Sequence, residues 1–318
     1  MIWRPPRPVR ILVPLLAALA AALGLVACGG SGGSGTTPTR AAATPPGATR
    51  PPVTLGTGSV TEQFVLGQLY EQALQAKGFR VALKQNVESP SVADAALRSG
   101  QIDLYPQYVG TFDAAVAHDA TRFPSARAAF AAGQAYAGRH GFRLLGMTPF
   151  GTTDALVVLP DYARAHRLAS VADLAPIRRL RLGAAPEFRG RPAGLAGLAR
   201  VYGIRDVDFA PLTVGLQYQA LDDGQIDVAA VATTDGQLQS GRYVLLSDTR
   251  HLFGFQNVAP VVSDRVLRAE GPAFAATLNA VSRALTTSAM QRMNAAVAID
   301  GRSPADVARQ FLQASGLV

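Results

Sequence analysis

The sequence predicts an α/β protein built of two similar lobes, because one helix-turn-strand pattern occurs twice. Residues 95–108 form an Ala/Leu-rich helical run that Gly100 stops, after which Gln-Ile-Asp opens an apolar strand. Residues 218–231 repeat this plan around Gly224. Glycine in these places is typical of a helix C-terminus. The copies lie about 124 residues apart, too far for a solenoid repeat, so we interpret them as equivalent units of two lobes.

The first lobe is predicted to hold a largely parallel sheet. We expect strands at residues 53–56 and 79–83, one helix after Ser59 and another after Ser89, where Pro90 suits a first helical turn. A third strand follows the first Gly-Gln-Ile-Asp copy. Strands and helices that alternate in this order require right-handed crossovers. Ligands of such sheets bind beyond the carboxyl ends of the strands.

Two segments are interpreted as crossings between the lobes, at residues 149–154 and near residues 247–257, because turn-forming and aromatic residues interrupt the pattern there. Lobe one is therefore expected to comprise residues 53–150 and 254–318, and lobe two residues 151–253. Further strands are expected at residues 142–146, 155–159, 180–184, 243–246 and 260–262. A protein with two such lobes most often uses the cleft between them.

The charge distribution argues against a nucleic-acid partner. The chain has 318 residues, of which 48% are hydrophobic and 16% charged, as in a globular protein with a full core. Five arginines of the net +8 lie within residues 1–52, which contain no acidic residue, so the rest of the chain carries +3. No basic stripe with interleaved aromatic residues is left to bind DNA or RNA.

The N-terminus has the pattern of a secretory signal. Residues 1–10 are basic, and residues 11–26 are apolar, too short for a membrane span but suited to a signal peptide. The stretch ends in Leu-Val-Ala-Cys, which resembles the lipobox of bacterial lipoproteins, cut before the cysteine and acylated on it. We expect removal of residues 1–27 and lipid anchoring through Cys28 on the extracytoplasmic face of the cell membrane. An ordinary signal peptide with an incidental cysteine is the alternative.

Two consequences follow for the residues after the signal. Cys28 is the only cysteine, so an intramolecular disulfide is excluded and the domain depends on packing alone. Residues 28–52 are dominated by Gly, Ser, Thr, Pro and Ala, which bury too little apolar surface to offset the entropy of ordering. We therefore expect a flexible tether, with the folded part beginning near Val53.

Ser59 and Glu62 have the spacing of a capping box, in which the serine caps a helix and the glutamate bonds back to the cap. The preceding strand would then deliver its carboxyl end to a helix N-terminus, whose free N–H groups suit an anion such as a carboxylate. The alternative is that the box serves only to cap the helix.

Motifs of common enzymes do not occur in the sequence. It contains no Gly-x-Ser-x-Gly elbow, no Walker loop and no His-Glu-x-x-His pair. The four histidines are scattered without metal-ligand spacing, at His118, His140, His166 and His251. We expect neither an enzyme nor a bound cofactor or metal. A surface hydrolase is the remaining enzymatic alternative, and activity on a chromogenic ester would favour it.

Six motifs follow one another in unbroken order from residue 53 to the C-terminus. They are Ser-Val-Thr-Glu-Gln at 59–63, Val-Ala-Asp-Ala-Ala-Leu at 92–97, Gly-Gln-Ile-Asp running into Tyr-Pro-Gln-Tyr-Val-Gly-Thr at 100–111, Pro-Glu-Phe at 186–188, Thr-Asp-Gly at 234–236 and Ala-Pro-Val-Val at 259–262. In this order they resemble the substrate-binding proteins of osmoprotectant ABC importers, the glycine betaine/carnitine/choline class. The resemblance implies a two-lobed type II periplasmic-binding-protein fold with two hinge crossings, which closes on a quaternary ammonium compound and delivers it to a membrane permease.

The resemblance also implies residues that bind the ligand. Family members hold the trimethylammonium head in a box of tyrosines by cation–π attraction, and Tyr108 takes one of the four box positions. Thr111 takes the place of a hydroxyl that binds the ligand carboxylate, and Arg191 falls on the family arginine that grips the same carboxylate. Ser59 would cap the helix end beside it.

The other box positions depart from the family pattern. Asp154 stands where an Asn-Asn-Thr-Tyr stretch usually supplies a tyrosine, Ala232 stands where another is common, and Gln256 replaces a third. Gly58 stands in the place of an early lysine. We interpret Asp154 as a countercharge for a cationic ligand and include Gln256 in the site.

Structural roles are the alternative for each of these residues. Tyr108 would then close a strand end, Arg191 would be a surface arginine and Asp154 a turn residue at the hinge. Two further tyrosines are interpreted as core residues, Tyr105 and Tyr218. For the whole protein, the alternatives are the same fold binding another small zwitterion or cation, and a surface sensor without transport. A permease subunit encoded beside the gene would favour transport.

Overall fold

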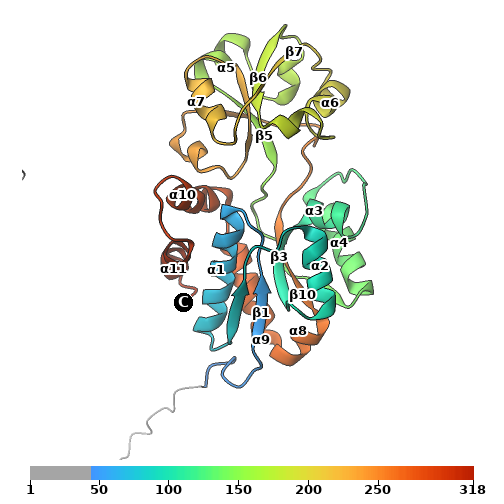
Figure 1. Cartoon of the computed structure of the whole chain (residues 1–318), viewed down its shortest axis with the longest axis vertical. Coiled ribbons are helices and arrows are strands. Elements are labelled where there is room, and N and C mark those ends of the chain that lie inside the picture. Colours follow the sequence, from blue (N-terminus) through green and yellow to red (C-terminus); the bar gives the residue numbers. More distant parts are fainter. Residues whose placement is uncertain (1–43) are drawn as a thin grey trace, which may run out of the picture. The chain divides into compact units, whose positions relative to one another are not determined.

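The computed structural model describes residues 44–318. The predicted signal peptide, Cys28 and most of the predicted tether lie outside the described residues. Residues 44–318 contain two five-stranded sheets, each with helices on both faces (Figure 1). We call each sheet with its helices a lobe. In this part of the chain no helix is both long and apolar enough to cross a membrane.

Sheet one has the strand order β2-β1-β3-β10-β4. Its strands are β1 (Val53–Gly56), β2 (Val81–Lys84), β3 (Leu104–Tyr108), β4 (Phe142–Leu144) and β10 (Val258–Ser263). β1 pairs in parallel with β2 and β3, whereas β10 runs antiparallel to β3 and β4. The carboxyl ends of β1 and β3 therefore lie at the same edge of the sheet.

Sheet two repeats this plan in the order β7-β6-β8-β5-β9. Its strands are β5 (Asp154–Val158), β6 (Leu180–Ala184), β7 (Val207–Pro211), β8 (Val228–Ala232) and β9 (Val244–Leu246). β6 pairs in parallel with β7 and β8, and β5 runs antiparallel to β8 and β9, as β10 does in sheet one. Edge strand β7 has no counterpart among the strands expected from the sequence.

The helices of lobe one form a layer on each face of sheet one, as Figure 1 shows. One face is covered by α1 (Thr61–Ala76), α9 (Pro272–Ala284), α10 (Thr287–Ala298) and α11 (Pro304–Ala314). The other carries α2 (Pro90–Ser99), α3 (Val109–Ala115) and α4 (Ala126–Arg139). Leu104 and Tyr105 are adjacent in β3 and are buried in opposite layers, as expected of a strand covered on both faces. α8 (Asp264–Glu270) follows β10.

Lobe two has the same layered arrangement with shorter helices. One layer contains α5 (Pro160–His166), η1 (Val171–Leu174), η2 (Pro186–Arg189), α6 (Leu195–Gly197) and η3 (Leu198–Tyr202), around Phe188 and Leu198. The other contains α7 (Leu216–Asp222) and η4 (Gly236–Ser240), around Tyr218 and Leu221. Tyr218 is 4% exposed, which confirms the core position predicted for it.

The two Gly-Gln-Ile-Asp copies occupy equivalent places, as predicted. The opening glycine has a φ of 77° in the first copy and 68° in the second, so each takes the left-handed conformation. The aspartate then bonds to the neighbouring parallel strand. Asp103 donates its N–H to the carbonyl of Thr54 at 2.8 Å and accepts from the N–H of Thr54 at 2.9 Å. Asp227 makes the same pair of bonds with Arg181, at 2.8 and 3.2 Å.

Residues 44–52, which the sequence assigns to the tether, lie against lobe one. The N–H of buried Gly47 donates to the carbonyl of Lys77 at 2.9 Å. The guanidinium of Arg50 donates to the carbonyl of Ala269 at 2.9 Å. The packed part of the chain therefore begins before β1.

Two crossings connect the sheets, residues 145–153 after β4 and residues 247–257 after β9. They are hydrogen-bonded to each other, because the N–H of Thr152 donates to the carbonyl of Gln256 at 3.0 Å. The side-chain amide of Asn257 donates to two carbonyls of the first crossing at 3.0 and 3.1 Å. The sequence predicts two crossings, and the structure places them side by side.

Candidate ligand-binding site

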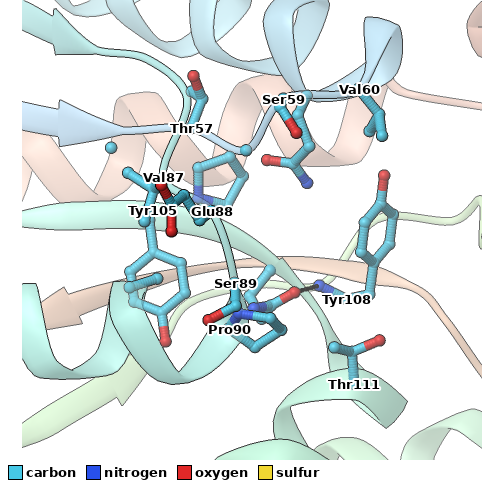
Figure 2. Close-up of a pocket in the computed structure, with 16 residues that line it drawn as sticks. Thr57, Ser59, Val60, Val87, Glu88, Ser89, Pro90, Tyr105, Tyr108 and Thr111 are labelled. Atoms are coloured by element: carbon cyan, nitrogen blue, oxygen red, sulfur yellow. Dashed lines mark hydrogen bonds between the residues drawn. The ribbon is translucent and has the colours of Figure 1, made fainter.

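A pocket of about 250 Å³ lies at the carboxyl ends of β1 and β3, beside the N-terminus of α1 (Figure 2). All of its lining residues fall within residues 56–111, so lobe one forms the whole pocket. The lining includes two aromatic rings and four hydroxyl-bearing residues other than tyrosine, namely Tyr105, Tyr108, Thr57, Ser59, Ser89 and Thr111. Glu88, which is exposed, is the only charged lining residue.

Helix α1 begins differently from the prediction. Val60 is the N-cap residue, with extended φ and ψ of −95° and 154°, and no side chain caps the helix. The capping box predicted for Ser59 and Glu62 is therefore wrong, because the helix begins one residue later than that spacing requires. Ser59 lines the pocket as an exposed residue. The helix end still directs its first-turn N–H groups and its positive dipole end at this region.

Two tyrosines form opposite sides of the pocket. In Figure 2 the ring of Tyr108 lies between Val60 and Thr111, and Tyr105 lies across from it. Tyr105 is 3% exposed, as predicted for a core residue, yet it also reaches the pocket. Burial raises the pKa of both phenols above the ordinary value, so both rings stay neutral. Neutral rings present a negative face that attracts cations.

Glu62 holds Tyr108 from behind the pocket. Its carboxylate is 6% exposed, and its Oε1 accepts hydrogen bonds from the hydroxyl of Tyr108 at 2.9 Å and of Thr152 at 2.6 Å. Its Oε2 accepts from Nδ2 of Asn294 in α10 at 3.0 Å. Nδ2 of Asn294 also donates to the carbonyl of Thr234 in lobe two at 2.9 Å. Glu62 therefore links the pocket, the first crossing and lobe two.

Thr111 and Gln256 are in direct contact. Oε1 of Gln256 accepts from the backbone N–H of Thr111 at 3.0 Å and from its hydroxyl at 3.2 Å. Gln256 does not line the tyrosine pocket. It borders a second pocket of about 330 Å³, which residues of both lobes line, among them Asp113 of lobe one and Pro192 of lobe two.

Asp154 and Arg191 form an ion pair within lobe two. Asp154 is the first residue of β5, and Arg191 follows η2. Burial raises the pKa of Asp154, and the guanidinium of Arg191 lowers it by a smaller amount. Neither residue lines the tyrosine pocket. In this structure each of the two neutralises the charge that the sequence analysis assigned to a ligand.

The structure brings three of the six predicted ligand residues into one pocket: Ser59, Tyr108 and Thr111. Gln256 adjoins them through Thr111, and Asp154 and Arg191 lie in the other lobe. Sequence reasoning missed the buried role of Glu62, although its spacing from Ser59 drew attention to it. Among residues 44–318, no group of three or more His, Cys, Asp or Glu is arranged to hold a metal ion.

Two lobes of equal topology, two adjacent crossings and a pocket at the strand ends define a two-lobed binding protein. A family model described as the substrate binding domain of ABC-type glycine betaine transport systems matches residues 51–314, and the chain belongs to this family. The family serves transport, and its members in general are not enzymes.

Known relatives agree with this assignment. The glycine-betaine-binding protein of Pseudomonas aeruginosa is 31% identical over 271 residues, covering 81% of this chain and 86% of the relative. The carnitine transport binding protein OpuCC of Listeria monocytogenes is 24% identical, covering 84% of this chain and 88% of the relative. Both alignments cover more than four fifths of the relative.

Solved structures share the fold. A crystal structure titled glycine betaine/carnitine/choline ABC transporter has a TM-score of 0.77 and 26% identity to this chain. The match covers 83% of this chain and 99% of the chain in that structure. Apo YehZ from Escherichia coli has a TM-score of 0.73 and 26% identity, covering 84% and 99%. The type II periplasmic-binding-protein fold predicted from the sequence is confirmed.

Proposed function

We propose that this protein is the lipid-anchored, extracytoplasmic solute-binding component of an ABC importer and captures a quaternary ammonium compound such as glycine betaine, choline or carnitine. The observation that carries the proposal is the pocket beside α1, where two neutral tyrosine rings face a space without lysine or arginine. Membership of the family supports the same ligand class.

The chemistry of the ligand matches this lining. A quaternary ammonium group has no N–H to donate, so hydrogen-bond acceptors alone cannot select it. Aromatic faces can, and a desolvated cation–π contact is worth on the order of 2 kcal/mol. We assign the cationic head to Tyr108, with Tyr105 completing the aromatic wall.

A carboxylate on the ligand would find its partners at the edge of the same pocket. The first turn of α1 offers free N–H groups and the positive end of its dipole, and Ser59 and Thr111 offer hydroxyl groups. Gln256 fixes Thr111 from the other side. In lobe two, Arg191 would take the carboxylate when the lobes close, which frees Asp154 to face the cationic head.

Closure is the step that would bring the lobe-two residues to the ligand. Ligand contacts on both lobes favour the closed state, because a ligand shifts an equilibrium towards the state it binds better. The two hydrogen-bonded crossings are the candidate hinge. The permease would recognise the closed form, and Cys28 would hold the protein at the membrane. No catalytic step is assigned to the protein.

A thermal-shift screen tests the ligand class. The purified protein is heated with glycine betaine, choline, carnitine, proline betaine or ergothioneine, since a ligand that binds only the native state raises stability with its concentration. We expect at least one quaternary ammonium compound to raise the melting temperature. Tyr108→Ala should abolish the shift, and Tyr162→Ala, in helix α5 of lobe two, should retain it. No shift with any of these compounds would contradict the proposal.

A further inference from the structure

Glu62 is a buried carboxylate that no partner of opposite charge neutralises within the part of the chain described here. Within residues 44–318, the hydrogen-bond partners of its carboxylate are all donors: the hydroxyls of Tyr108 and Thr152 and the amide of Asn294. Three donors and no acceptor are the surroundings of an ionised carboxylate, which can only accept. Burying such a charge is unfavourable unless it has a use or a partner.

Tyr108 contacts both this charge and the pocket. Its ring lines the pocket, and its hydroxyl points away from Thr111 and donates to Oε1 of Glu62 at 2.9 Å (Figure 2 shows the ring). Burial raises the pKa of Tyr108 well above its ordinary value, and the charge of Glu62 raises it further. The phenol therefore remains the donor in this bond.

A phenol that donates to a carboxylate has a more electron-rich ring than a free phenol. A hydrogen bond to an ionised acceptor is stronger than one to a neutral acceptor, and it draws the proton away from the phenolic oxygen, which shifts electron density into the ring. Cation–π attraction is electrostatic and grows with the negative charge of the ring face. The charge of Glu62, at the hydroxyl edge of the ring, also attracts a cation held against the ring face, and burial of Glu62 strengthens this attraction.

We propose that Glu62 is a positioning residue of the ligand site, which fixes the ring of Tyr108 and makes its face more attractive to a cationic head. This inference rests on the proposed function, because it requires a cation in the tyrosine pocket. It also supplies the negative charge that Asp154 cannot offer while it is paired with Arg191.

The surroundings of Glu62 keep its charge in place. Thr152 belongs to the first crossing, and its hydroxyl also contacts the hydroxyl of Thr234 at 3.1 Å. Asn294 is 8% exposed and bonds both Glu62 and Thr234. A carboxylate held by three separate elements has little freedom to turn away, so its effect on Tyr108 is constant.

The test separates charge from shape. Isothermal titration compares choline with 3,3-dimethyl-1-butanol, the uncharged compound in which carbon replaces the ammonium nitrogen. Glu62→Gln keeps the size of the side chain and removes its charge. We expect this variant to bind choline about tenfold more weakly and the uncharged compound less than about twofold more weakly. Equal losses for both compounds, or none, would overturn the inference.

A second variant tests whether the effect runs through Tyr108. Tyr108→Phe keeps the ring and removes the bond to Glu62, so it should also lower the ratio of choline to isostere affinity. In the Tyr108→Phe background, Glu62→Gln should then lower the affinity for choline by a smaller factor than it does in the wild type. An unchanged cost would show that Tyr108 does not transmit the effect and would overturn the inference. If Glu62→Gln does not fold, the ratio measured for Tyr108→Phe alone decides.

Matched controls distinguish a failure of this inference from a failure of the proposed function. Asp103→Asn removes another buried carboxylate of lobe one, at the opposite end of β3 from the pocket, and should lower stability without changing the choline ratio. A wild type that binds neither choline nor glycine betaine would contradict the proposed function and the inference together. A wild type that binds choline, with a ratio insensitive to Glu62→Gln, would contradict the inference alone.

Discussion

Asp113 should make the protein less stable as pH rises. The side chain lies in α3 at 2% exposure, and neither carboxyl oxygen has a hydrogen-bond partner among residues 44–318. It is packed so closely on α4 that a Cβ added at Gly133 would lie 2.9 Å from Oδ1. Burial raises the pKa of Asp113 from 3.8 to about 7, and the charge of Asp119 contributes to the rise.

The sign follows from the raised pKa. Below pH 3.8 the carboxyl is protonated in both the folded and the unfolded chain, so its full favourable contribution is present. Between pH 3.8 and about 7 the unfolded chain ionises while the folded chain does not, so stability falls steadily. Above about pH 7 the loss is complete. It amounts to about 4 kcal/mol at most, because each pKa unit corresponds to ~1.4 kcal/mol and the adjoining pocket admits water.

Urea denaturation at pH 5 and pH 8 measures this loss. Asp113→Asn is the reference, because it keeps the size of the side chain and cannot ionise, and every other titrating group is common to both proteins. Relative to the variant, the free energy of unfolding of the wild type should fall by up to about 3 kcal/mol from pH 5 to pH 8. If both proteins change by the same amount, the carboxyl of Asp113 does not titrate as the structure requires.

Three further substitutions test separate parts of the structure. Ser89→Ala should lower the free energy of unfolding by about 1 kcal/mol, because the hydroxyl caps α2. Ser59→Ala should change it by less than ~0.5 kcal/mol, because Ser59 caps no helix. Equal effects in thermal melts would contradict the helix start described here. Gly236→Ala should destabilise the protein by roughly 1–3 kcal/mol, because its methyl would lie 2.6 Å from α10. Gly138→Ala, whose methyl would meet nothing within 4 Å, should be neutral or stabilising. The reverse order of stabilities would refute the packing of η4 on α10. Cys28→Ser should release the protein from membranes or leave its signal uncleaved, and an unchanged membrane fraction after washing would contradict lipid anchoring.

Much of the fold follows from local signals in the sequence. β1 and β6 have the bounds expected from their short apolar runs, and Ser89 caps α2 as its place before Pro90 predicts. β7 was not predicted from the sequence, because it is an edge strand whose residues are half-buried or exposed and therefore lacks a continuous apolar run. The helix start at α1 was misplaced because the capping-box spacing alone does not fix which residue becomes the cap.

The site is less predictable, because its interactions join distant residues. Resemblance drew attention to Tyr108 and Thr111, which the structure places in one pocket. The role of Glu62 depends on Thr152 and Asn294, which are 90 and 232 residues away along the chain. No local pattern encodes such a contact.

Binding of glycine betaine and choline, measured by isothermal titration, tests the central claim most directly. The wild type should bind at least one of them with one site per chain. Arg191→Ala should weaken the binding of glycine betaine by roughly 2–5 kcal/mol and the binding of choline only slightly, because only glycine betaine has a carboxylate that the variant leaves unpaired. Asp154→Asn should also weaken the binding of glycine betaine, whose carboxylate draws Arg191 away from Asp154, and should affect choline less, because choline leaves the Asp154–Arg191 pair intact.

Arg189→Ala is the matched control for the arginine, since Arg189 is a neighbouring arginine that stacks on Phe209 instead of pairing with Asp154, and it should bind both ligands as the wild type does. A wild type that binds neither ligand, or affinities that neither Arg191→Ala nor Asp154→Asn changes, would contradict the account.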